Sequence, residues 1–428
     1  MKTIDGEKNR RQKTSSFGLL QFALCAVPML LASTSSFGSN DESTPETNSS
    51  LIPNITWQPC DASGTTAFEC AVASLPLDHS QPDNGELIDV ALARLPASDQ
   101  ANKIGTIFLN PGGPGGSGVS FLLNAGPVLF NAEVREKFDL LGFDPRGIGA
   151  STPLVCFENF DQLIRYLDAP GVPSLFDDIK IKQNADKHYA ELCRKNAGEI
   201  KRFMATADVA QDMDLLRQAV GDEKLNFAGY SYGSYLGVTY ANMFPNNIRA
   251  LLVDGVLDPI AWSTGRGGEQ HHLPVTTRLK SDIGAMDTLN EFFKLCDAGN
   301  DACVFSGNSA QRYAALAEQL KSGPLLLEFP DGSSFTLDYD TFIGFSLSYM
   351  YNSFGWSEFA ELLLDVETFS TTQRLSNRLK THLSPETVLI NRAVENTDMP
   401  QTIEGFDNVL CSDSNLSLIH ISEPTRPY

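Results

Sequence analysis

The chain has 428 residues, of which 42% are hydrophobic and 20% are charged, a composition typical of globular proteins. Its formal net charge of −21, without a basic stripe, argues against nucleic acid or an anionic membrane as a partner. The length allows a large core in one domain or two.

The N-terminus has the layout of a secretory signal peptide. Four basic residues between Lys8 and Lys13 precede an apolar run over 17–32, and small residues follow up to Gly38. We therefore expect residues 1–38 to be a signal peptide and the mature protein to be secreted. The run is short for a membrane span, so no stable span is expected after cleavage; an uncleaved anchor is the alternative. Residues 39–54 predict a disordered lead, with glycosylation acceptors at Asn48 and Asn54 if the source is a eukaryote.

Strands and helices are expected to alternate over residues 55–258, the N-terminal part of the core. Apolar or alternating runs predict strands at 87–95, 105–109, 138–143, 225–228 and 248–253. A helix is expected from Thr206, as its N-cap, to Val220, with Asp208, Asp212 and Asp214 toward its start. Residues 151–200 form a polar excursion. The alternation predicts a mostly parallel sheet with helices on both faces.

A G-x-S-x-G pattern, Gly229-Tyr230-Ser231-Tyr232-Gly233, lies between a predicted strand and a predicted helix. In this context the turn forces the serine into a strained conformation that exposes its hydroxyl, and glycines on either side keep Cβ atoms out of the bend. We therefore predict Ser231 as a nucleophile, with Gly229 and Gly233 as elbow residues. The alternative is a glycine-rich turn with an incidental serine.

A nucleophilic serine needs donors for the oxyanion that it creates. One should be the backbone N–H of Tyr232, and the second should come from Gly112 or Gly113 in the glycine loop after the 105–109 strand. A phosphate cradle is the competing interpretation of this loop. It is weakened because the loop has no Gly-Lys-Ser/Thr ending and its prolines remove donors.

Residues 259–408 predict a mostly helical cap inserted over the sheet, with an independent helical domain as the alternative. Helices are expected at 290–295, 310–320, 357–364 and 371–379, and strands only at 325–329 and 334–337. Residues 409–416 are expected to begin a C-terminal part of the core. Residues 417–428, SLIHISEPTRPY, resemble a translated sequencing adapter and are taken as a foreign tail.

The cysteine spacing predicts disulfides and no metal. There are eight cysteines, of which Cys25 would leave with the signal peptide, and no CxxC pair favours zinc. In an oxidising compartment the neighbours suggest Cys60–Cys70, Cys156–Cys193 and Cys296–Cys303. Cys411 is left without a partner.

Several segments in order resemble one family. NPGGPGGSG, DPRGIGAST, GYSYGSYLG and LLVDGVLDP, with the opening ITWQPC…FEC…LPLDHSQP, are similar to the α/β-hydrolase family of secreted tripeptidyl aminopeptidases, related to prolyl iminopeptidases, over about 55–413. The resemblance implies an α/β-hydrolase fold with an inserted cap, acylation of Ser231, no cofactor, and a peptide substrate whose free N-terminus is held by acidic groups. Cap carboxylates such as Glu269, Glu358 or Glu361 could hold that amine, although a solvated surface charge is the simpler interpretation of each.

The chain departs from this family in its catalytic triad. The family order is Ser, Asp, His, and the last two residues follow the cap; here the expected Asp turn and Gly-His are absent, and the last strands are missing, leaving an apolar sheet edge. The remaining histidines are expected at the surface: His79, His188, His271, His272 and His382. Asp254 could act as an acid in a variant arrangement, although a sheet-end turn is the simpler interpretation.

Two predictions follow from this departure. The intact protein is a serine aminopeptidase, whereas this chain is a truncated and inactive form of it. An esterase or lipase of the same fold and a non-catalytic hydrolase-like protein are the alternatives. Ser231 excludes dehalogenases and epoxide hydrolases, which need a carboxylate at the elbow. The sequence makes no prediction of oligomeric state.

Overall fold

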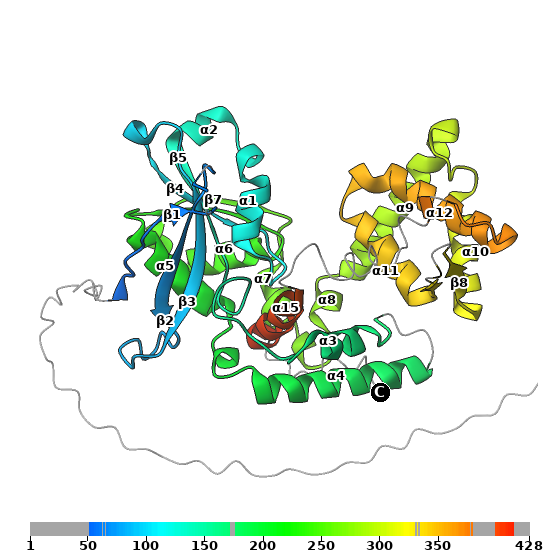
Figure 1. Ribbon diagram of the computed structural model, residues 1–428, viewed down its shortest axis with the longest axis horizontal. Helices are drawn as coiled ribbons and strands as arrows, with labels where there is room; N and C mark the ends of the chain where they lie inside the picture. The colour runs from blue at the N-terminus through cyan, green and yellow to red at the C-terminus, as the bar shows by residue number, and fades with distance from the viewer. Residues whose placement is uncertain are drawn as a thin grey trace, which may run out of the picture. The chain divides into compact units, whose positions relative to one another are not determined.

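The computed structural model describes residues 51–61, 63–64, 66–171, 176–329, 332, 334–376, 378–379 and 399–414 (Figure 1). The predicted signal peptide, Asn48, His382 and the tail at 417–428 lie outside these residues. Among the described helices, none combines the length and the apolar character needed to cross a membrane.

A seven-stranded sheet is the centre of the fold, in the order β1-β2-β3-β5-β4-β6-β7 (Figure 1). The pairs β1–β2, β2–β3 and β3–β5 are antiparallel, and β5, β4, β6 and β7 are parallel. The predicted mostly parallel sheet is therefore confirmed. The strands are β1 (Gln58–Pro59), β2 (Glu69–Pro76), β3 (Leu87–Leu95), β4 (Gly105–Asn110), β5 (Phe138–Phe143), β6 (Leu225–Tyr230) and β7 (Ile248–Asp254).

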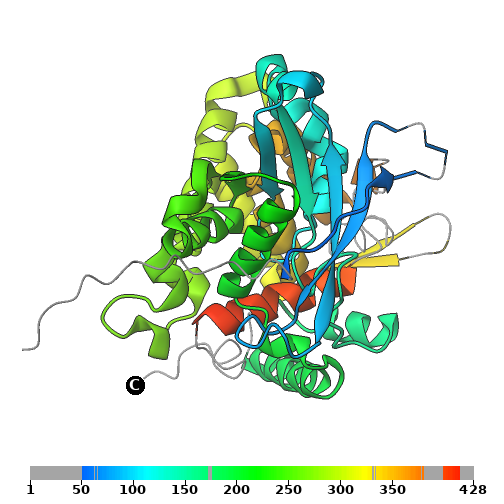
Figure 2. The ribbon, with the colours of Figure 1, turned by 90° about the vertical axis from the view of Figure 1, so that its left-hand side faces the viewer.

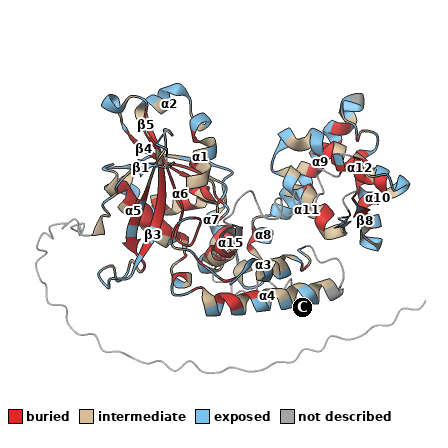
Figure 3. Cartoon of the chain, in the orientation of Figure 1, coloured by how far each residue is buried: buried red, intermediate tan, exposed pale blue. Residues whose placement is uncertain are grey.

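Successive residues of the central strands point to opposite faces of the sheet, as the pleat requires. Ile107 and Leu109 of β4 pack with Leu122 of α1 (Gly118–Leu129). Phe108, between them, packs in the cluster that contains α5 (Thr206–Ala219) and α6 (Tyr232–Met243). Helices therefore cover both faces, as predicted. Figure 2 shows α5 and α6, in green, beside the sheet, and Figure 3 shows the buried length of β3.

Strand β7 is the outer strand of the sheet and is only partly covered. Leu252 is 45% exposed. The predicted apolar edge is thus present in the described part of the chain.

The polar excursion contains two helices that the sequence analysis did not anticipate, α3 (Phe160–Leu167) and α4 (Phe176–Asn196). Its two ends are joined by the Cys156–Cys193 disulfide. The Cys60–Cys70 and Cys296–Cys303 bonds are present as well, and Cys411 is a free thiol. α2 (Ala132–Lys137) leads into β5.

Residues 259–372 are mostly helical, with a core of their own around Phe292, Phe305 and Phe359. The two predicted strands are present and pair as an antiparallel hairpin. The helix predicted at 371–379 is wrong, because α12 ends at Thr372 and Gln373 takes a left-handed φ of 55°. The short helices α7 and α8 and the longer helix α11 were not predicted. The elements are α7 (Pro259–Ser263), α8 (Val275–Arg278), α9 (Ser281–Gly299), α10 (Ser309–Ser322), β8 (Leu325–Glu328), β9 (Ser334–Leu337), α11 (Tyr339–Met350) and α12 (Trp356–Thr372).

The last described helix, α15 (Met399–Ser414), runs through the boundary that was expected at residue 409. It contacts α5 and α7, and its buried residues appear red in Figure 3. Val409 and Leu410 of α15 belong to the same apolar cluster as α5 and α6. This helix is therefore part of the core packing around the end of the sheet.

Candidate active site

Ser231 occupies a sharp turn between β6 and α6. Its backbone has φ 53° and ψ −122°, a region that residues other than glycine rarely adopt. Two hydrogen bonds hold the turn: Ser231 N–H donates to the Asp254 carbonyl at 2.8 Å, and Ser234 N–H donates to the Ser231 carbonyl at 2.9 Å. The residue is exposed. The strand–turn–helix geometry predicted for the motif is therefore present.

The two elbow glycines are required by close backbone approaches. A Cβ atom on Gly229 would overlap the Gly233 carbonyl, and one on Gly233 would lie 2.6 Å from the Asn110 carbonyl oxygen. Backbone atoms cannot yield at such distances without moving the strand. Each glycine thus allows β6, α6 and the end of β4 to meet at Ser231.

The glycine loop after β4 lies directly against the elbow. A Cβ on Gly112, whose φ is 96°, would overlap the Tyr230 carbonyl and lie 3.0 Å from Ser231 Cβ. The Gly112 N–H already donates to Asn110 Oδ1 at 2.9 Å. Within the described residues no hydrogen bond engages the N–H of Tyr232 or of Gly113. Of the two glycines predicted as oxyanion donors, the geometry therefore favours Gly113.

This constellation falls within the region of a family match. A sequence model of the family described as alpha/beta hydrolase fold matches residues 105–268, which include both the glycine loop and the elbow. Residues 105–268 therefore have the α/β-hydrolase fold.

Three relatives refine this relationship. The chain is 32% identical to "Serine protease Hip1" of Mycobacterium tuberculosis over 71% of this chain and 56% of the relative. It is 35% identical to "Tripeptidyl aminopeptidase" of Streptomyces lividans over 48% of this chain and 38% of the relative. It is 30% identical to "Carboxylesterase B" of Mycobacterium tuberculosis over 75% of this chain and 60% of the relative. The predicted relationship to tripeptidyl aminopeptidases is confirmed. The chain spans less than two thirds of the length of each of these relatives.

A buried carboxylate connects the glycine loop to the turn after β5. Asp144 Oδ1 accepts from Ser117 Oγ at 2.6 Å, and its Oδ2 accepts from Ala150 N–H at 2.9 Å. A Cβ on Gly149 would overlap this carboxylate. The motif DPRGIG therefore fixes the loop that lies against Ser231.

Arg146 of the same motif is fully buried and forms an ion pair with Asp212 of α5. Its Nε and Nη2 donate to the two carboxylate oxygens at 2.8 and 2.7 Å. Burial opposes both charges, but the mutual attraction outweighs it, so the pKa of Asp212 is lowered and that of Arg146 is raised. Asp212, which the sequence placed only toward the start of this helix, therefore serves as the partner of Arg146.

His79 joins the same pair, with Nε2 at 2.8 Å from Asp212 Oδ1 and 3.0 Å from Arg146 Nη2. Its side chain is only 7% exposed. The expectation that His79 is a surface residue is therefore wrong, because the turn after β5 and helix α5 enclose it.

In the part of the chain that the structure describes, no histidine and no aspartate side chain is hydrogen-bonded to Ser231. His271 contacts Gln270, and His188 and His272 make no hydrogen bond to the serine. Asp254 reaches the elbow only through its carbonyl oxygen, and its side chain is exposed. No described residue thus occupies the position of a general base.

The three candidate amine-binding carboxylates lie on two elements: Glu269 begins the short 3₁₀ helix Glu269–His271, and Glu358 and Glu361 lie three residues apart on α12. Glu269 accepts from Arg266 N–H at 2.8 Å, and Glu361 is 3.3 Å from Arg378. Glu358 lies in the first turn of α12 and is exposed. In the described part of the chain, no hydrogen bond joins any of the three to Ser231.

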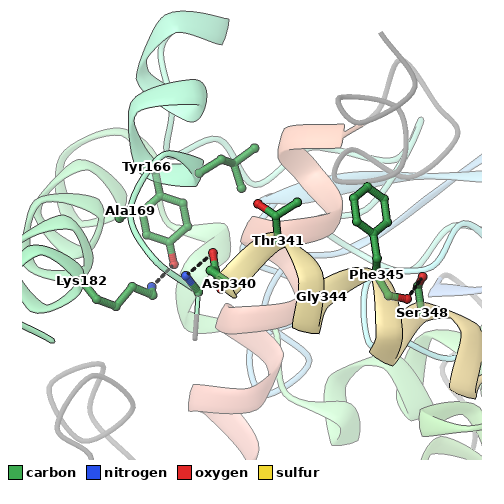
Figure 4. A pocket seen from close by; sticks show the side chains of 10 residues that line it. Tyr166, Ala169, Lys182, Asp340, Thr341, Gly344, Phe345 and Ser348 are labelled. Atoms are coloured by element: carbon green, nitrogen blue, oxygen red, sulfur yellow. Dashed lines mark hydrogen bonds between the residues drawn. The ribbon is translucent and has the colours of Figure 1, made fainter. Parts of the chain in front are cut away.

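A pocket of about 350 Å³ is lined by residues of α3, α4 and α11 (Figure 4). Asp340 Oδ2 accepts from Gly171 N–H at 3.0 Å, and Lys182 Nζ donates to Tyr166 Oη at 3.2 Å. The lining contains no residue of the elbow or the glycine loop. The first bond joins the excursion to α11, and the second joins α4 to α3 within the excursion.

Two carboxylates near the site were missed by sequence reasoning, and both lie on α15. Glu404 Oε1 accepts from the N–H groups of Cys156 and Phe157, each at 2.8 Å. Asp413 Oδ1 accepts from Thr206 N–H at 2.8 Å. Thr206 is therefore not the N-cap of α5; it is the first helical residue, and Asp413 satisfies its N–H. No local signal could have shown this, since 207 residues separate the partners.

Proposed function

We propose that the complete protein is a secreted serine aminopeptidase that releases short peptides from free N-termini. The observation that carries the proposal is the conformation of Ser231: a serine at φ 53° on an exposed strand–helix elbow, with the glycine loop against it. The relationship to a tripeptidyl aminopeptidase and a serine protease supports the reaction class.

In the proposed reaction Ser231 Oγ attacks the scissile carbonyl carbon while a base removes its proton. The N–H groups of Tyr232 and Gly113 donate to the oxyanion. The C–N bond then breaks, the leaving amine takes the proton, and an acyl-enzyme forms on Ser231. Water hydrolyses this ester and restores the serine.

The aspartate and histidine that activate Ser231 are proposed to come from sequence outside this chain. The basis is that the relatives are much longer and that no described residue is bonded to Ser231 as a base. We accordingly expect this chain alone to turn over no substrate, since loss of a triad base reduces the rate by several orders of magnitude.

Secretion is proposed on three grounds. The N-terminal pattern is that of a signal peptide, the three disulfides suit an oxidising compartment, and Asn54 is exposed, as a glycosylation acceptor must be. The substrate amine is proposed to be held by a cap carboxylate, with Glu269, Glu358 and Glu361 as candidates.

The test compares three reagents on the complete gene product. We expect cleavage of an unblocked tripeptide anilide, no cleavage of its N-acetylated form, and fluorophosphonate labelling that disappears in Ser231→Ala. A preference for simple acyl esters would instead support an esterase, the alternative favoured by the similarity to Carboxylesterase B. Absence of labelling in the wild type would support a non-catalytic protein.

A further inference from the structure

Asp413, near the end of α15, accepts three hydrogen bonds. Its Oδ1 accepts from Thr206 N–H at 2.8 Å. Its Oδ2 accepts from Thr206 Oγ1 at 2.6 Å and from Trp262 Nε1 at 2.9 Å. The carboxylate thus joins the start of α5 to α7.

The direction of the next hydrogen bond follows from these contacts. The Thr206 hydroxyl gives its proton to Asp413, so the bond between Thr206 Oγ1 and Tyr232 Oη must have the tyrosine as donor. Thr206 and Tyr232 are 1% and 3% exposed, so no solvent competes for these groups. A single chain of donors therefore runs from Tyr232 through Thr206 to Asp413.

The tyrosine ring is held on its face as well. The ring centroids of Tyr232 and Trp262 are 5.4 Å apart, and Trp262 is itself bonded to Asp413. One carboxylate consequently fixes both the hydroxyl of Tyr232 and the indole that packs against its ring.

We propose that Asp413 is a positioning residue for the nucleophile elbow. Tyr232 directly follows Ser231, and its backbone N–H is the proposed oxyanion donor. By fixing the Tyr232 side chain, Asp413 holds the peptide group between Ser231 and Tyr232 in the orientation that the oxyanion needs. The inference rests on the proposed function.

The chemistry of the cluster requires a carboxylate at this position. All three partners are donors, so an asparagine would turn its NH₂ group toward at least one N–H or O–H. The N-terminus of α5 also favours a negative charge. Burial raises the pKa of Asp413, while the bonds from Thr206 and Trp262 act in the opposite direction.

The test measures the rate at which a fluorophosphonate acylates Ser231 in the complete gene product. We expect Asp413→Asn and Tyr232→Phe each to slow acylation about 10-fold. This reduction is smaller than the roughly 100- to 1,000-fold reduction that follows complete removal of an oxyanion donor, because the Tyr232 N–H remains and is only less well oriented. Because both act through one chain, the double variant should be no slower than the slower single variant. For a peptide anilide, kcat should fall while KM stays unchanged.

The control is Glu404→Gln, which alters another buried carboxylate of the same helix. It should leave acylation at the wild-type rate, since among the described residues Glu404 bonds only to Cys156 and Phe157 of the excursion. If Asp413→Asn fails to fold, Tyr232→Phe still tests whether the hydrogen-bonded chain affects acylation, because this variant retains the ring and removes only the hydroxyl.

Two results would overturn the inference. Unchanged acylation in folded Tyr232→Phe or Asp413→Asn, with only the melting temperature lowered, would make Asp413 a purely structural residue. If the reductions in acylation rate were additive in the double variant, Asp413 and Tyr232 would act independently and not through one hydrogen-bonded chain. If the wild type does not react with the fluorophosphonate at all, both the proposed function and this inference fail. If the wild type and Asp413→Asn are labelled at the same rate, only this inference fails.

Discussion

Replacing Glu404 by glutamine should remove a large part of the pH dependence of stability. The Glu404 side chain is 1% exposed, and its Oε2 has no hydrogen-bond partner in the described part of the chain. Burial raises the pKa of this carboxyl from 4.5 to about 7, although the bonds from the N–H groups of Phe157 and Cys156 lower it in part.

The magnitude follows from the pKa difference between the folded and unfolded states. The folded protein retains a proton on Glu404 up to about pH 7, whereas the unfolded chain loses it near pH 4.5. The contribution of Glu404 to the free energy of unfolding is therefore greatest below pH 4.5 and decreases as the pH rises to about 7. Since one pKa unit corresponds to about 1.4 kcal/mol, the wild type should lose roughly 3 kcal/mol across this window relative to Glu404→Gln.

Urea unfolding of both proteins from pH 4 to pH 8 measures this difference. The two should be similarly stable at pH 4, because glutamine resembles the protonated acid and can accept from the same two N–H groups. The variant should be the more stable at pH 8. Glu318→Gln, at an exposed pair on α10, is the control and should change stability by less than about 0.5 kcal/mol at any pH. A constant gap between wild type and Glu404→Gln at all pH values would refute the reasoning.

Three further changes test the packing. Gly229→Ala should prevent folding, because the added Cβ would overlap the Gly233 carbonyl. Its control is Gly284→Ala in α9, where the Cβ meets no atom within 4 Å; this change should raise the free energy of unfolding by about 0.5–1 kcal/mol, and thermal melts followed by circular dichroism compare the two variants. Arg146→Met should cost about 3–5 kcal/mol in urea unfolding, because it removes the permanent positive charge from the buried Asp212 carboxylate and leaves only the contact with His79 among the described residues. A loss below about 1 kcal/mol would contradict the importance of the ion pair. Replacing Cys156 and Cys193 by alanine should cost about 4 kcal/mol, from the 37-residue separation, and unchanged stability would argue that the unfolded chain is not restrained by this bond.

The sequence predicted the site where local signals were enough. The strand before Ser231, the helix after it and the glycines around it are encoded within about twenty residues, so the elbow could be placed without tertiary information. The apolar runs of β4, β5 and β6 showed their burial in the same way. The disulfides followed from proximity in sequence.

What could not be predicted depends on distant partners. His79 lies among polar residues in the sequence, and only Arg146 and Asp212 explain its burial. Thr206 looked like an N-cap, yet Asp413 performs that role from another helix. Such roles are properties of the packed structure, because a polar side chain carries no local mark of the partner that will satisfy it.

The contact between Thr206 and Asp413 also bears on how the protein is made. The two residues are 207 positions apart, so a ribosome adding about 5–20 residues per second needs roughly 10–40 s to supply the second after the first. During this interval the start of α5 lacks its carboxylate and the Tyr232 hydroxyl has no fixed acceptor chain. The turn at Ser231 in a nascent chain is therefore incompletely supported until α15 has been synthesised, when most of the fold around it already exists.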